Sequence, residues 1–283
     1  MSNSKEIKPS QPDAIKELQK SLDKNGLRQN SWDSWDSCEH DNYNEQKEDD
    51  HCDPCGIKNC KPIGPNNLYA YFIGANPITS FIPISRCPNI DNTCFIGPFS
   101  SVIGDVVIKK NVFVGCNAVL RADEGTPFHI GRNSNIQDGV ILHGLKNEQY
   151  TVNGKKYSIY VGNDVTLAHG SLIHGPCVIE NKVFVGFNAL VFNAIVEDMC
   201  YIEIGSIVTG GIRLHANSYV PTGAIIDTQE KADALETVPQ SKEDFAKKVI
   251  KVNVELAAAY SLKFGDTRCS CGLCCDHNTL IHD

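Results

Sequence analysis

A six-residue spacing of aliphatic side chains runs through the chain between residues 90 and 226. The aliphatic positions are Ile90, Ile96, Val102, Ile108, Val114, Leu120, Ile130, Ile136, Leu142, Val161, Leu167, Ile173, Ile179, Val185 and Val191. A one-residue slip then resets the phase to Val196, Ile202, Val208, Leu214, Val220 and Ile226. A short period that persists over so many cycles predicts a solenoid, because each turn buries its apolar side only against neighbouring turns.

Hexapeptides of this kind are typical of the left-handed parallel β-helix, an exception to the right-handed crossover rule. We therefore predict an all-β solenoid over residues 76–240. Helical spacing of apolar residues after Ser241, a candidate N-cap, predicts a helix over 241–264 that packs on the solenoid. We expect residues 1–75 to form a polar, partly disordered extension with a cysteine cluster and one short amphipathic helix at 12–22, and residues 265–283 to form a cysteine-rich tail.

Three hexads make one triangular coil, so positions three hexads apart stack on one face. When the hexads are counted and the insertions are left out, Leu120, Leu142 and Ile173 are each three hexads apart and are predicted to stack. Their successors Arg121, His143 and His174 then form a ladder on that face. Gln137 and His169 follow Ile136 and Leu167, which belong to a different face.

One chain therefore cannot easily bring all three imidazoles together. Three chains packed side by side would bring His169 of one to His143 and His174 of the next, which predicts a homotrimer with a metal site at each interface. A single histidine on a β-helix usually fills a surface or makes a hydrogen bond, as we expect for His129 and His215. Three imidazoles with an open fourth position are typical of catalytic zinc, and an ion bound in this way lowers the pKa of its water to about 7.

Three segments around the histidines carry a family resemblance. "RADEG" at Arg121–Gly125, "NIQDGVILHG" at Asn135–Gly144 and "LAHGSLIHGP" at Leu167–Pro176 resemble gamma-class carbonic anhydrases. The resemblance extends from Asn76 to Tyr260. Its combination of motifs is specific, whereas a bare hexapeptide repeat is shared with many acyltransferases.

The resemblance implies a ligand set and a substrate. It implies that His143, His169 and His174 bind Zn²⁺, Fe²⁺ or Co²⁺, one ion per subunit interface, and that the substrates are carbon dioxide and bicarbonate. Gln137 matches the glutamine that hydrogen-bonds metal-bound hydroxide, and Asn135 matches its neighbouring asparagine.

The resemblance also assigns roles around the metal. Glu124 matches a glutamate that relays protons, and Asn253 matches an asparagine that orients carbon dioxide. Arg121 and Asp138 match an ion pair that joins subunits, with Asp123 beside it.

Two positions depart from the family pattern. Lys146 stands where well-known members carry a surface shuttle glutamate, and an ammonium group is a poor proton acceptor at neutral pH. Glu148 could take its place if the loop bends suitably. An aromatic residue near the family's site is replaced by Lys251, so turnover is expected to be modest or dependent on buffer.

Charge and hydropathy restrict the partners and the compartment. The 283 residues carry a net charge of −8 with no basic run, which argues against a nucleic-acid partner. No apolar stretch is long enough to span a membrane, and the first residues lack the apolar core of a signal peptide. We expect a cytoplasmic protein.

The 13 cysteines fall into two groups. Five lie within the hexads, where they act as small packing residues. The others include two tail clusters that could form a second metal site: Cys52, Cys55 and Cys60, and Cys269, Cys271, Cys274 and Cys275. We consider three interpretations of the tail cysteines. Reduced cysteines that bind metal only adventitiously are the most favoured interpretation, a genuine second metal site is the next, and disulfides are the least favoured.

The leading functional hypothesis is a lyase that hydrates carbon dioxide reversibly, with metal-bound hydroxide as the nucleophile. The first alternative is a hexapeptide-repeat acyltransferase, which needs a single histidine as general base rather than three imidazoles. The second alternative is a scaffold subunit with little activity, because gamma-class-like proteins also serve as structural components. Only the site can separate these hypotheses, since one fold supports many functions.

Overall fold

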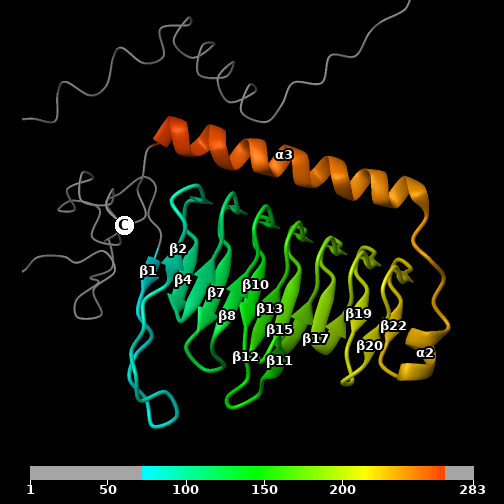
Figure 1. The fold of residues 1–283 in the computed structure, drawn as a ribbon, viewed down its shortest axis with the longest axis horizontal. Coiled ribbons are helices and arrows are strands. Elements are labelled where there is room, and N and C mark those ends of the chain that lie inside the picture. The colour runs from blue at the N-terminus through cyan, green and yellow to red at the C-terminus, as the bar shows by residue number, and fades with distance from the viewer. Residues whose placement is uncertain (1–71, 265–283) are drawn as a thin grey trace, which may run out of the picture. The chain divides into compact units, whose positions relative to one another are not determined.

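The described part of the chain forms a parallel β-solenoid with three faces and a long helix alongside it (Figure 1). A computed structural model describes residues 72–264. The predicted left-handed parallel β-helix is confirmed as the fold class.

The first two faces share one 13-stranded sheet, because β15 and β17 bend across the corner between them, and the third face is a separate 7-stranded sheet. The first face contains β1 (Phe72–Gly74), β4 (Ser101–Gly104), β7 (Val119–Ala122), β10 (Ile141–His143), β19 (Ile207–Val208), β22 (Ile225–Ile226) and the first halves of β15 (Leu172–Ile179) and β17 (Leu190–Val196). The second face contains β2 (Asn89–Ile90), β5 (Val106–Ile108), β8 (Phe128–Ile130), β13 (Ile159–Val161), β20 (Arg213–Leu214) and the second halves of β15 and β17. The third face contains β3 (Phe95–Ile96), β6 (Phe113–Val114), β9 (Asn135–Ile136), β14 (Thr166–Leu167), β16 (Phe184–Val185), β18 (Tyr201–Ile202) and β21 (Tyr219–Val220).

The aliphatic repeat forms the core. Leu120 pairs in register with Leu142, and Leu142 pairs with Ile173, as the hexad count predicts. Almost every repeat position is buried, including those after the slip, such as Val196 and Ile226. Because side chains alternate along each strand, the residues between the repeat positions point outward and are free to form a surface site.

Left-handed backbone at the corners explains the polar residues between the strands. Asn111, Asn133 and Asp164 stack at one corner with φ values of 57° each. Their side chains form a ladder, in which Asn111 donates to Asn133 and Asn133 donates to Asp164. Asn and Asp tolerate this conformation better than other residues with side chains, so they turn the chain at low cost.

One excursion between coils is a β-hairpin that follows His143. β11 (Tyr150–Val152) and β12 (Lys155–Tyr157) pair antiparallel across Asn153 and Gly154. Both turn residues have positive φ, as a two-residue hairpin loop requires.

Two helices follow the last coil. α2 (Gln229–Asp233) is capped by Thr228, and α3 (Gln240–Phe264) runs back along the solenoid (Figure 1), packing on β3, β6, β9 and β14 of the third face. α3 begins one residue before Ser241, so Ser241 lies in its first turn and is not its N-cap. Strand β1 also precedes the expected start of the solenoid at residue 76 and pairs with β4.

Several sequence-based expectations lie outside the described residues. They are the amphipathic stretch at 12–22, the extended N-terminal segment and both tail cysteine clusters. Within residues 72–264, no helix is both long and apolar enough to cross a membrane.

Candidate metal centre

His143 and His174 stand side by side on the first face. Strands β10 and β15 pair His143 with His174, and β7 pairs Arg121 with His143, so the predicted ladder is present. The ring centroids of the two histidines are 5.2 Å apart, and His143 Nδ1 is 3.3 Å from His174 Nε2. Phe192 on β17 continues the ladder and meets the His174 ring edge-on.

Charged groups from β7 and the residues directly after it surround His143. Its Nε2 lies 3.1 Å from Arg121 Nη2, 3.6 Å from Glu124 Oε2 and 3.7 Å from Asp123 Oδ1. Burial lowers the pKa of His143, and the nearby charges of Arg121 and His174 lower it further. The neutral imidazole is the form that can bind a metal ion.

His169 lies on the other side of a corner, after β14 of the third face. Its ring stacks on Phe187, and its Nδ1 is 3.1 Å from Asp138 Oδ2. Asp138 is held in turn, because its Oδ1 accepts a 2.7 Å hydrogen bond from the Cys116 amide.

A chain of amide groups connects His169 to β9. Gln137 Oε1 accepts from the His169 backbone N–H at 3.3 Å, and Gln137 Nε2 donates to Asn135 Oδ1 at 3.0 Å. Asn135 Nδ2 donates to Thr166 Oγ1 at 2.9 Å. Gln137 and Asn135 are both buried, so this chain fixes which way each amide points.

The donor set of one chain fits a metal ion only in part. Within residues 72–264, no group of three or more histidine, cysteine or acidic side chains is arranged to hold a metal. Imidazoles and carboxylates are suitable ligands for Zn²⁺, Fe²⁺ and Co²⁺, and His143 and His174 supply two imidazoles. His169 follows β14 on the third face and is not grouped with these two imidazoles within the described residues, in agreement with the hexad count.

The two residues expected to join subunits each contact a candidate ligand inside this chain. Arg121 reaches His143 and also pairs with Asp123 at 3.2 Å, while Asp138 pairs with His169. The Arg121 side chain is 47% exposed, so its pair with Asp123 contributes only about 0–1 kcal/mol. The contacts of Arg121 with His143 and of Asp138 with His169 join side chains far apart in sequence, so the sequence did not predict them.

Glu124 and Asn253 are the remaining predicted site residues. Glu124 Oε1 accepts a 3.3 Å hydrogen bond from the Lys146 amide, so position 146 is next to the predicted relay. Lys146 turns its ammonium over the Phe81 ring, 5.1 Å from the centroid. Asn253 is buried on α3 and donates to Val249 O, and no hydrogen bond joins it to the histidines within the described residues.

Comparisons with known proteins agree with the repeat and the motifs. The family described as "Bacterial transferase hexapeptide (six repeats)" matches residues 88–122. A carbonic anhydrase from Methanosarcina thermophila is 39% identical over 203 residues, which cover 66% of this chain and 81% of that protein.

Two further relatives differ from each other in what they do. The carboxysome assembly protein CcmM of Nostoc sp. is 45% identical over 183 residues, covering 64% of this chain but only 32% of that protein's length. The mitochondrial gamma carbonic anhydrase 1 of Arabidopsis thaliana is 31% identical over 140 residues, covering 50% of this chain and 47% of that protein. By its similarity to the Methanosarcina and Arabidopsis proteins, this chain belongs to the gamma-class carbonic anhydrase family.

Proposed function

We propose that this protein is a metal-dependent carbonic anhydrase, which converts carbon dioxide and water to bicarbonate and a proton at sites shared between the subunits of a homotrimer. One observation carries the proposal. His143 and His174 are paired in register on one face, while His169 and the Gln137 amide are held together on another. Each of the two faces carries half of the proposed site, so a second copy of the chain could supply the half that the first lacks at that face.

His143, His174 and the His169 of an adjacent subunit would hold the ion, which can be Zn²⁺, Fe²⁺ or Co²⁺. When bound, such an ion lowers the pKa of a coordinated water to about 7 and so supplies hydroxide at neutral pH. Gln137 would orient the reacting oxygen, because Asn135 and the His169 amide already fix its side chain.

Glu124 would accept the proton that the reaction releases. Its carboxylate lies beside His143, and its side chain is 39% exposed, so a proton on Glu124 can reach solvent. The family role of Asn253, orienting carbon dioxide, is part of this proposal. Its helix packs on β9 and β14, the strands that carry Asn135 and precede His169.

An aliphatic column next to the histidines supports subunit contact at this face. In the first-face strands from β7 to β22, the outward residue two positions before the ladder position is aliphatic, and these residues are in register from coil to coil. The column consists of Val119, Ile141, Leu172, Leu190, Ile207 and Ile225. Ile141 and Ile225 are 42% and 52% exposed. A continuous apolar surface of this kind is typical of protein interfaces.

One observation favours a second candidate function, a scaffold subunit with little activity. Lys146 occupies the family's shuttle position beside Glu124, and its ammonium is engaged with Phe81. The similarity to CcmM, described as an assembly protein, is consistent with such a role.

A combined metal and activity measurement tests the proposal. Protein purified without oxygen should contain about one ion per chain and should hydrate carbon dioxide in a stopped-flow pH-indicator assay. The same protein stripped with a chelator should lose activity and regain it with zinc, ferrous or cobaltous ion. Full metal occupancy without hydration would favour the scaffold, and absence of stoichiometric metal would contradict the proposal.

A further inference from the structure

A glycine directly follows each of three proposed site residues on the first face. Gly125 follows Glu124, Gly144 follows His143, and Gly175 follows His174. None of these glycines has the positive φ that would demand glycine for conformational reasons. Another physical cause must therefore explain the absence of a side chain at all three positions.

The buried residue Ser158 is common to all three crowded positions, although backbone atoms of Gly144 and Leu145 also crowd Gly125, and the Ser158 carbonyl oxygen crowds Gly175. A Cβ added to Gly125, Gly144 or Gly175 would lie within 3.0 Å of the Ser158 hydroxyl oxygen, and for Gly175 the separation would be 2.7 Å. Real Cβ atoms essentially never approach other atoms so closely. The three glycines thus converge on one point behind the site, and Ser158 fills it.

Ser158 is held in place by its backbone. It is the residue at which the chain re-enters the solenoid after the β11–β12 hairpin. Its N–H donates to Pro127 O at 3.0 Å in the coil before, and its carbonyl accepts from the Cys177 amide at 2.9 Å in the coil after. The residue is fully buried, so it has no free space into which to withdraw.

Hydrogen bonding by the hydroxyl does not explain why residue 158 is a serine. Ser158 Oγ is buried and has no hydrogen-bond partner among residues 72–264. A buried hydroxyl without a partner is unfavourable, and its removal can be neutral or stabilising. What Ser158 supplies is a small volume that matches the space left by three glycines.

We propose that Ser158 is a positioning residue, whose size sets the separation of the backbone segments that carry Glu124, His143 and His174. The inference rests on the proposed function, since it concerns how those side chains are presented to a metal ion. A larger residue at 158 would press on backbone rather than on flexible side-chain ends. The segments bearing the histidines would have to move, because closely packed interiors do not absorb an added methyl group without a shift.

Three variants separate volume from hydrogen bonding. Ser158→Thr keeps the hydroxyl and adds a methyl group, Ser158→Ala removes the hydroxyl without adding volume, and Ser158→Cys adds less volume than threonine. Ser206→Thr is the matched control, because Ser206 is also fully buried but lies in the last coils, where its hydroxyl donates to Pro221 O at 2.7 Å.

The readouts are Co²⁺ affinity and the visible absorption spectrum of the bound Co²⁺, which reports coordination geometry independently of turnover. Ser158→Thr should lower affinity about 10- to 100-fold, as changes to residues that orient metal ligands do, and should alter the spectrum. Ser158→Cys should show a smaller change, and it carries the test if the threonine variant does not fold. Ser158→Ala and Ser206→Thr should retain the wild-type spectrum and affinity.

An equal loss of Co²⁺ affinity in Ser158→Ala and Ser158→Thr would contradict the role of side-chain volume. Wild-type Co²⁺ affinity in folded Ser158→Thr and Ser158→Cys proteins would contradict it as well. Metal-free crystal structures keep this inference distinct from the proposed function. They should show His143 and His174 displaced in Ser158→Thr or Ser158→Cys but not in Ser206→Thr. If wild-type protein binds no Co²⁺ and the histidines still shift, the positioning role is supported and the proposed function fails. Unshifted histidines would overturn the positioning role.

Discussion

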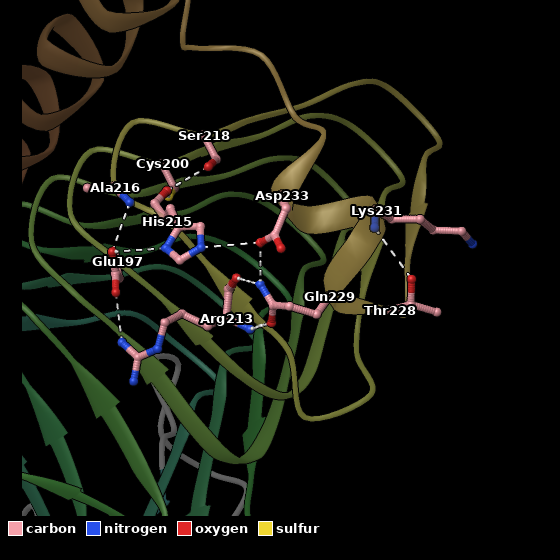
Figure 2. Close-up of polar contacts among 10 residues, drawn as sticks. All are labelled: Glu197, Cys200, Arg213, His215, Ala216, Ser218, Thr228, Gln229, Lys231 and Asp233. Carbon is pink, nitrogen blue, oxygen red and sulfur yellow. Dashed lines mark hydrogen bonds and ion pairs between the residues drawn. The ribbon is translucent and has the colours of Figure 1, made fainter.

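Two regions of this solenoid carry histidines beside charged residues, and they differ in whether one chain satisfies them. In the last coils, His215 Nε2 is 3.2 Å from Asp233 Oδ1, and Glu197 bonds both Arg213 at 2.7 Å and the Ala216 amide at 3.0 Å (Figure 2). Gln229 donates to both Asp233 and the Arg213 carbonyl. This network attaches α2 to the solenoid and is complete within the chain.

The central coils have a different arrangement. His143 and His174 contact each other, and the third histidine of the family motif lies around a corner with Asp138. The comparison teaches that a histidine beside carboxylates on a β-helix is not by itself a metal site. Stacking in register on one face, with a complementary half-site on another, is the feature that distinguishes the proposed metal centre.

The largest expected difference between the regions is in metal content. His143→Ala and His169→Ala should each lose the metal and at least about 100-fold in hydration activity, because each removes one of three ligands. His215→Ala should retain both, since its partners only attach α2. Metal analysis and stopped-flow hydration measure the two effects. A metal-free His215→Ala protein would reverse the comparison.

The aliphatic column should be needed for assembly. Leu190→Glu places a charge in the column without touching a ligand, and we expect it to dissociate the trimer and release the metal. Met199→Glu is the control, because Met199 is an exposed apolar residue at a different corner. Light scattering with metal analysis measures both changes. A trimeric, metal-loaded Leu190→Glu protein would show that subunits meet elsewhere.

Glu124→Ala should lower turnover by about 10²-fold, because it removes the carboxylate proposed to accept the released proton. Metal content should not change. Glu197→Ala in the last coils removes a carboxylate whose pKa is lowered mainly by its hydrogen bond to Arg213, and it should leave turnover unchanged. If Glu124→Ala matched the wild type in turnover, protons would leave by another route.

The smallest expected effect is at Lys146. Wild-type turnover should rise with the concentration of a permeant buffer such as imidazole, and Lys146→Glu should raise turnover a few-fold at low buffer and weaken that dependence. Lys231→Glu on α2 is the matched charge change and should do neither. If Lys146→Glu behaves as the wild type, Glu148→Ala decides whether Glu148 already serves as the shuttle.

Much of the architecture could be predicted because the core is built from coils that repeat along a single axis. Each coil meets only its neighbours, so counting hexads was enough to place Leu120, Leu142 and Ile173 in register and His169 on another face. These predictions depend on contacts that the repeat itself defines.

The remaining features depend on side-chain contacts that a repeat does not encode. Arg121 turns toward His143 and Asp138 toward His169 because of the space and charge around them, not because of their hexad positions. The proposed role of Ser158 depends on Gly125, Gly144 and Gly175, which come close to it only in the folded chain. The network around His215 depends on α2, a helix too short to give a periodic signal.

The central claim is that each site is divided between two chains, and subunit mixing tests it most directly. His143→Ala and His169→Ala proteins would be combined under conditions that exchange subunits and then assayed for metal and hydration. Every mixed trimer has one interface with a full ligand set, so a random equal mixture should recover about one quarter of wild-type metal and activity. If exchange is verified and the mixture stays as inactive and metal-poor as its components, the sites are not shared between chains.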